Sequence, residues 1–141
     1  MPSIFSRIIA GELPGRFVWK DERAVAFLSI APMMPGHTLV VPREEVDHWI
    51  DLEPTLAAHL IVVAQTIARA HEQVYRPLKV GLLIAGLEVP HTHLHVIDII
   101  HGEVDMHLDH NPGSPTPDEL EAEAVKIRAA LTDLGADGVS E

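Results

Sequence analysis

The sequence predicts an α+β domain with an antiparallel sheet of about five strands, one long helix and short flanking helices. Short β-branched and aromatic runs recur between turn residues, which is typical of strands joined as hairpins. One stretch near the middle of the chain instead repeats apolar residues at helical spacing. The chain has 141 residues, the size of one domain, and 47% of them are hydrophobic, enough for a sizeable core.

Five segments have the composition of strands. The first two flank a polar turn at residues 21–23, and the third is stopped by Pro42, which has no N–H to donate to a neighbouring strand. The fifth alternates histidine with apolar residues. We expect these strands at residues 16–20, 24–28, 38–41, 79–84 and 92–100.

Three segments predict helices. Residues 53–75 form the longest, and residues 3–10 form a short helix with Ser3 as its cap. The last helix starts at Thr116, where Glu119 completes a capping box. The residues expected to face the core are Leu56, Leu60, Val63, Ile67, Ala70 and Val74 in the long helix and Leu120, Ala124, Ile127, Leu131 and Leu134 in the last.

The predicted organisation has three parts. Residues 1–101 contain all five strands and form the domain core. Residues 102–117 are polar and rich in proline, which predicts a loop. Residues 118–141 form the last helix and a tail, which we expect to pack on or extend the same domain.

Composition limits the possible partners. Lysine and arginine number 10 against 21 aspartate and glutamate, a formal net charge of −11. This argues against nonspecific binding to nucleic acid or to an anionic membrane, although one pocket can still hold a small anion. The chain has no cysteine, no apolar run long enough to span a bilayer and no signal-peptide pattern at its start. We therefore expect a cytoplasmic protein without disulfides or thiolate chemistry.

The strongest functional signal is the run Pro90-His91-Thr92-His93-Leu94-His95-Val96. In a strand, residues i, i+2 and i+4 share a face, so the three imidazoles should form a row with neighbours about 6.5–7 Å apart. The residues alone leave three interpretations open. The row is a solvated strand face, a site for zinc or a similar metal, or a nucleophilic imidazole assisted by its neighbours.

The same run resembles the His-x-His-x-His-x-x motif of the histidine triad family. Other segments resemble that family in the same order, so the resemblance extends from about Ile4 to Ile97. They are Ile4-Phe5-Ser6-Arg7-Ile8-Ile9 with Gly11-Glu12-Leu13-Pro14, Ala26-Phe27-Leu28-Ser29-Ile30 with Pro32, Pro35-Gly36-His37-Thr38-Leu39-Val40-Val41-Pro42, and Ala85-Gly86-Leu87-Glu88-Val89-Pro90. The resemblance implies the fold of that family, a homodimer, and a site for a purine nucleotide of the AMP or GMP type, without a cofactor or metal.

By this resemblance His93 is the nucleophile, which attacks the α-phosphate and forms a nucleotidyl-histidine. A backbone carbonyl near the first histidine fixes its tautomer, which places His91 and its backbone in the orienting role. His95 and His37 contact the phosphate, and His95 gives a proton to the leaving group. Backbone N–H groups around Glu88 and Val89 stabilise the developing charge.

The resemblance also implies an apolar pocket for the base, and this chain departs from the family at the sugar and phosphate. Ser29 stands where the family usually has the aspartate that binds the ribose hydroxyls. Val80, Leu87 and Glu88 replace residues that are often asparagine, glutamine, and serine or threonine. The paired-cysteine zinc motif of some members is absent. By position, the base pocket falls on Ile4, Phe5, Ile8, Phe27 and Ile30.

The preferred expectation is an enzyme that hydrolyses a nucleoside monophosphate from a phosphoramidate or a related leaving group. The transferase branch of the family has glutamine where this chain has His95, which favours hydrolysis over nucleotidyl transfer. Two alternatives stay open. One is a nucleotide-binding module with weakened catalysis, and the other is a metalloenzyme with His91, His93 and His95 as ligands.

Overall fold

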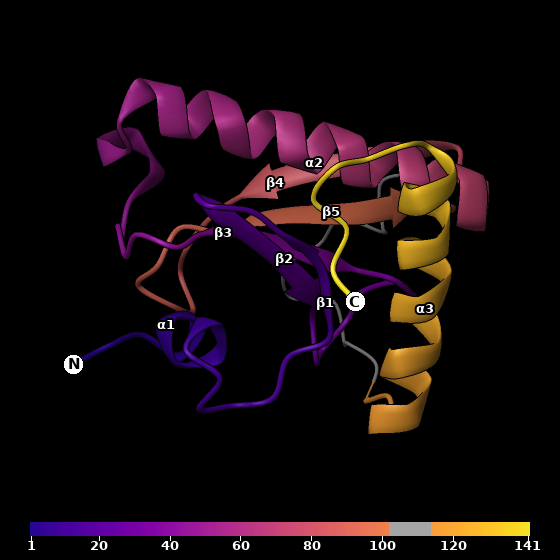
Figure 1. Ribbon diagram of the computed structural model, residues 1–141, viewed down its shortest axis with the longest axis horizontal. Helices are drawn as coiled ribbons and strands as arrows, with labels where there is room; N and C mark the ends of the chain where they lie inside the picture. Colours follow the sequence, from indigo (N-terminus) through magenta and orange to yellow (C-terminus); the bar gives the residue numbers. More distant parts are fainter. Residues whose placement is uncertain (102–113) are drawn as a thin grey trace.

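The α+β prediction is confirmed by a computed structural model, which describes residues 1–101 and 114–141. Five strands form one antiparallel sheet in the order β1-β2-β3-β5-β4 (Figure 1). The strands are β1 (Phe17–Lys20), β2 (Ala24–Leu28), β3 (Thr38–Pro42), β4 (Lys79–Ile84) and β5 (Leu94–Ile99). The helices are α1 (Ile4–Ile9), the short 3-10 helix η1 (Trp49–Asp51), α2 (Pro54–Tyr75) and α3 (Pro117–Asp133).

Several strand and helix boundaries differ from those expected from the sequence. Strand β5 starts at Leu94 rather than at Thr92, because the N–H and hydroxyl of Thr92 both donate to the carbonyl of Val46 at 2.8 Å. The residue Pro42, expected to stop β3, is its last member. Leu134, expected on the core face of α3, lies just after the helix and is 46% exposed. Residues 102–113 of the expected loop lie outside the described residues.

The central strands β2, β3 and β5 are buried on both faces of the sheet. Helices α2 and α3 cover one face, where they pack on Ala24, Ala26 and Val40. Helix α1 lies against the other face, where Phe5 packs with Phe27 (Figure 1). Every residue of β2 and β3 is buried, which explains why these strands read as unbroken apolar runs rather than as alternating ones. None of the described helices is long and apolar enough to cross a membrane.

The helix ends follow the signals in the sequence. Ser3 caps α1 by accepting from the N–H of Ser6, and Glu53 caps α2 by accepting from the N–H of Thr55. The predicted capping box of α3 is present in both directions between Thr116 and Glu119. These caps satisfy N–H groups that have no partner inside their own helices.

The C-terminal tail returns to the first strand. The N–H of Lys20 donates to the carbonyl of Gly138 at 2.8 Å, and the N–H of Ser140 donates to that of Val18 at 3.1 Å. A Cβ atom at Gly138 would lie 2.3 Å from the indole ring of Trp19, so no larger residue fits there. The tail therefore pairs with the edge of β1.

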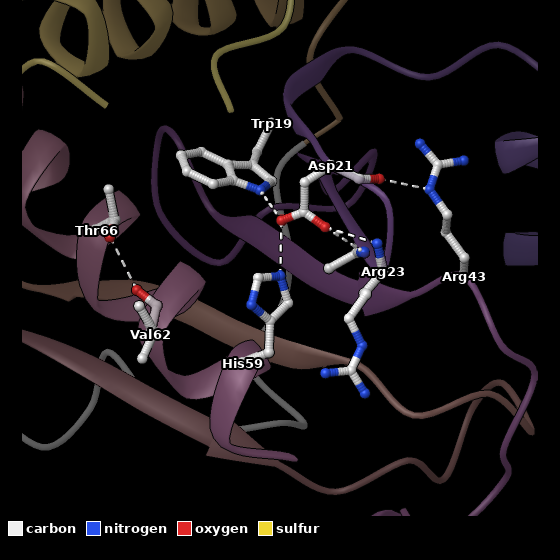
Figure 2. A network of polar contacts seen from close by, with 8 residues as sticks. Trp19, Asp21, Arg23, Arg43, His59, Val62 and Thr66 are labelled. Atoms are coloured by element: carbon white, nitrogen blue, oxygen red, sulfur yellow. Dashed lines mark hydrogen bonds and ion pairs between the residues drawn. The ribbon is translucent and has the colours of Figure 1, made fainter. Parts of the chain in front are cut away.

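One aspartate ties the β1–β2 turn to helix α2. One carboxylate oxygen of Asp21 accepts from Trp19 Nε1 and lies 2.7 Å from His59 Nε2, while the other accepts from the N–H groups of Arg23 and Ala24 (Figure 2). Burial alone raises the pKa of Asp21, but these hydrogen bonds outweigh it and hold the pKa below its usual 3.8. The ionised carboxylate is therefore part of the folded structure.

We expect Asp21→Asn to lower the free energy of unfolding by about 1–3 kcal/mol, because the amide NH₂ would face either the N–H of Trp19 or those of Arg23 and Ala24. Urea denaturation at pH 7 measures this. The carboxylate stabilises the fold above the unfolded pKa, and this contribution is lost as pH falls through the lowered folded pKa. The difference between the two proteins should therefore shrink on acidification.

The matched control is Thr66→Ala in α2, which removes an exposed hydrogen bond from the Thr66 hydroxyl to the carbonyl of Val62 (Figure 2). We expect it to change stability by less than about 0.5 kcal/mol. An equal loss in both variants would mean that Asp21 has no special role.

Candidate active site

His91 is held at both ring nitrogens. Its Nε2 donates to the carbonyl of Pro42 at 2.7 Å, and its Nδ1 accepts from the hydroxyl of Ser3 at 2.7 Å. The ring is fully buried, and burial lowers its pKa. Of the three histidines expected in one strand, only His95 lies within β5, since His91 and His93 precede its first residue.

A small polar cluster supports this arrangement. The hydroxyl of Ser6 and the N–H of Ser3 both donate to Oε1 of Glu45 at 2.7 Å, and Ser3 in turn donates to His91. These residues join the start of α1 to the segment after β3. We call Ser3, Ser6, Glu45 and His91 the N-terminal cluster.

His93 is held by the backbone of the same segment. Its Nδ1 lies 2.8 Å from the carbonyl of His91, and because a carbonyl can only accept, Nδ1 carries the proton. In the neutral ring the lone pair is then on Nε2. The edge of Phe5 packs on this imidazole, with ring centroids 4.9 Å apart. One nitrogen of His93 is therefore fixed and the other is available for chemistry.

His37 and His95 form a chain with one favoured set of protons. The N–H of Met33 donates to Nδ1 of His37 at 3.1 Å, so in neutral His37 the proton is on Nε2. That nitrogen lies 2.9 Å from Nδ1 of His95, which must accept. The proton of neutral His95 is then on Nε2, a buried atom without a hydrogen-bond partner among the described residues.

Burial and neighbouring imidazoles keep the rings of His37 and His95 neutral. Burial first, and then the charges of His95, His71 and His93, lower the pKa of His37 to about 3. Burial, and then the charge of His93, lowers the pKa of His95 to about 4, against a smaller opposing effect of Glu88. At pH 7 His95 therefore offers a neutral N–H donor beside His93, whose ring centroid is 4.9 Å away.

The chain is similar to known proteins over most of its length. The profile of the HIT domain matches residues 10–99. The chain belongs to the HIT family. Its relatives include Protein hit of Bacillus subtilis, which is 35% identical over 99 residues, or 67% of this chain and 68% of that protein. Members of this family bind nucleotides.

Solved structures confirm the fold of this HIT protein. A hypothetical histidine triad nucleotide-binding protein from Sulfolobus tokodaii superposes with a TM-score of 0.81 at 25% identity, covering 92% of each chain. A zinc-bound histidine triad family protein from Mycobacterium smegmatis superposes with a TM-score of 0.78 at 30% identity, covering 94% of each chain.

The residues expected at the base and phosphate divide into two groups. Phe5 and Ile8 of α1 pack in one cluster with Phe27 of β2, and Val89 lies against the same cluster. In contrast, Ile4 and Ile30 are 47% and 77% exposed, so this HIT protein does not place them in the same cluster.

Ser29 follows β2, and its backbone N–H donates to the carbonyl of His37 at 2.9 Å. Its hydroxyl accepts from the N–H of Ala31 at 3.2 Å. Ser29 and His37 also line a cavity of about 540 Å³ between the 32–37 turn and the start of α3. His93 is not in its lining, so the cavity lies beside the histidine cluster rather than over it.

Glu88, His93 and His95 are a possible ligand set for a metal. One donor atom from each lies within 4.8 Å of the others, and Glu88 Oε2 is 3.6 Å from His93 Nε2. Imidazole and carboxylate are ligands of zinc. However, the hydrogen bonds that run from Met33 through His37 to His95 put the proton of His95 on Nε2, the nitrogen that a metal would need. The residues thus fit a metal only after His95 changes its tautomer.

Sequence reasoning missed a buried histidine–aspartate pair on the opposite face of the sheet. His71 Nδ1 lies 3.0 Å from Asp98 Oδ1, and both side chains are fully buried. Its Nε2 lies 3.0 Å from the hydroxyl of Thr38, which itself donates to the carbonyl of Gly36. Both ring nitrogens therefore have a polar partner. The signal was present, since His71 falls on the apolar stripe of α2, four residues after Ile67.

The N-terminal cluster gives a test of what holds His91. We expect Glu45→Ala to lower the melting temperature, because two donors lose their shared acceptor. Glu45→Gln should have little effect, since both donors bind one oxygen, which the amide retains. Thermal unfolding of the three proteins measures this. Equal losses in both variants would show that charge, not the acceptor, is what matters.

Proposed function

We propose that this protein hydrolyses a nucleoside monophosphate from a phosphoramidate or a related leaving group through a nucleotidyl-histidine at His93. The observation that carries the proposal is the pair of nitrogens at the centre of the site. His93 Nε2 has a lone pair because Nδ1 donates to the carbonyl of His91. Beside it, His95 Nε2 is a buried donor that has no hydrogen-bond partner among the residues that the structure describes. A nucleophile next to an anion-binding donor suits attack on phosphorus.

In the first step, the lone pair of His93 Nε2 forms a bond to the α-phosphorus and the bond from phosphorus to the leaving nitrogen breaks. The leaving nitrogen keeps that electron pair and takes up a proton from solvent. His93 becomes positively charged while Nδ1–H still donates to His91. Neutral His95 donates a hydrogen bond to a phosphoryl oxygen. Release of its proton would leave an imidazolate, so hydrogen bonding suits His95 better than proton transfer.

In the second step, water attacks the phosphorus and the bond to His93 breaks. The electron pair returns to Nε2, water loses a proton to solvent, and the nucleoside monophosphate leaves. For this step the site must admit water, and the exposed side chain of Glu88 marks its open side. The purine base would lie near Phe5 and Phe27, and Ser29 offers one hydroxyl to the ribose, a weaker acceptor than a carboxylate.

We expect His93→Ala to abolish turnover of an adenosine phosphoramidate, because no other group would be in place to attack. His95→Ala should reduce kcat by about 10²–10³-fold, because it removes a hydrogen-bond donor to the phosphoryl oxygen. Mass spectrometry of the enzyme quenched during turnover should find one adenylyl group on the peptide that contains His93. Full activity of folded His93→Ala would overturn the assignment, and binding of AMP without turnover in the wild type would favour the binding-module alternative.

Metal binding is the second candidate, favoured by the Glu88, His93 and His95 set and by the zinc-bound relative from Mycobacterium smegmatis. Stoichiometric zinc in the purified protein, lost together with activity on chelation, would support it over the nucleophile proposal. The proton on His95 Nε2 argues the other way.

We also propose that the protein is a homodimer joined along β4 and α2. Strand β4 is at an edge of the sheet, and an edge presents unpaired N–H and carbonyl groups. Leu78, Leu82 and Ile61 of this region are 70%, 46% and 45% exposed. A second copy would cover both features.

Size-exclusion chromatography with light scattering should give twice the chain mass. Leu82→Glu should give monomers, because it places a charge in the proposed interface. Leu134→Glu is the control, since Leu134 is equally exposed but lies at the end of α3. A monomeric wild type, or dimers in both variants, would contradict the proposed interface.

A further inference from the structure

The carboxylate of Glu88 lies beside the nitrogen that would attack the substrate. Its Oε2 is 3.6 Å from His93 Nε2. An atom about to be attacked lies roughly 3–3.5 Å from its nucleophile, so this carboxylate oxygen is about as close to His93 Nε2 as the phosphorus must come. The side chain of Glu88 is 57% exposed. A phosphoryl group bound at His93 would therefore have this carboxylate as a neighbour.

Among the described residues, no lysine or arginine offsets this carboxylate, because none forms a hydrogen bond or ion pair with Glu88, His93, His95 or His37. The imidazoles of His37 and His95 are neutral at pH 7. Glu88 is therefore the acidic side chain that a leaving group meets beside His93 in the described part of the site.

We propose that Glu88 selects substrates by the charge of their leaving group, accepting cationic and neutral amines and rejecting anionic groups such as phosphate or pyrophosphate. This inference rests on the proposed function, because it assigns the substrate class of the same site. The chemistry is the first step above, in which the phosphorus–nitrogen bond breaks and the amine carries away the electron pair. Glu88 stabilises an ammonium group on the departing amine and repels a carboxylate or phosphate there.

The size of the effect follows from exposure. Two unit charges a few ångströms apart interact weakly in a water-like environment and more strongly when water is excluded. For a half-exposed carboxylate we expect about tenfold in kcat/KM for each unit of leaving-group charge.

The test uses three adenosine 5′-phosphoramidates whose alkyl tails have equal length and end in an ammonium, a methyl or a carboxylate group. For the wild type, kcat/KM should fall in that order, with about tenfold between neighbours. Glu88→Gln should bring the three values within about threefold of one another, and Glu88→Lys should reverse the order. Glu22→Gln is the matched control, since it removes the same charge from an exposed position in the β1–β2 turn and should keep the wild-type order.

A second measurement separates this inference from the proposed function. AMP alkyl esters with the same three tails are poorer substrates, and calorimetry with them reports binding alone. If all three phosphoramidates are turned over but kcat/KM does not follow the charge of the tail, the role of Glu88 is overturned and the hydrolase proposal stands. If none is turned over, but the affinity for the esters follows the charge of the tail and Glu88→Gln removes this dependence, the hydrolase proposal is overturned and the charge selection stands. No order in either measurement for the wild type would overturn the inference outright.

Discussion

The hydrogen bond from His93 Nδ1 to the carbonyl of His91 is the contact on which the site depends, and its strength lies in what holds that carbonyl. Residues 91 and 92 are fixed from three directions, by Ser3, by the carbonyl of Pro42 and by the carbonyl of Val46. These bonds also decide where β5 can begin. A segment bound to the neighbouring loop cannot pair in the sheet as well, so pairing starts at Leu94, opposite Ile84 and Val40. The site and the register of the central strand thus have one origin.

The fold was predictable because each element carries its own local pattern. Helix α2 follows from the spacing of Leu56, Leu60, Val63 and Ile67, and α3 from the capping box at Thr116. The start of β5 at Leu94 was not predictable from alternation alone. Alternation describes a strand, and His91 leaves the strand to bind groups 49 and 88 residues away in the sequence. Similarly, nothing local to Ile30 indicates that its side chain is exposed while that of Phe27 is buried.

Two polar chains cross the buried part of the molecule on opposite faces of the same strands. His37 and His95 lie on the α1 face, and Thr38, Asp98 and His71 lie on the α2 face. They alternate because neighbouring residues of a strand point in opposite directions. His37 precedes Thr38, so a shift of β3 against α2 would move both chains together. Buried polar groups are costly unless each has a partner. The partners of Thr38 and His71 therefore fix the position of β3, and with it that of His37.

In the proposed mechanism, the charge of the site explains how an acidic protein can bind a nucleotide and still release it. There the phosphate would meet the neutral N–H donors of the described site, and hydrogen bonds between neutral donors and an anion are less favourable than those of an ion pair. A cation held against the phosphate would stabilise the bound substrate, the intermediate and the product alike, and uniform binding of this kind does not speed the chemical step. Once His93 is bonded to phosphorus, however, its own ring is positively charged and lies against the phosphoryl oxygens. That charge arises with the intermediate and disappears when water cleaves it. The positive charge therefore acts on the intermediate and is gone when the product has to leave, which a permanent arginine could not achieve.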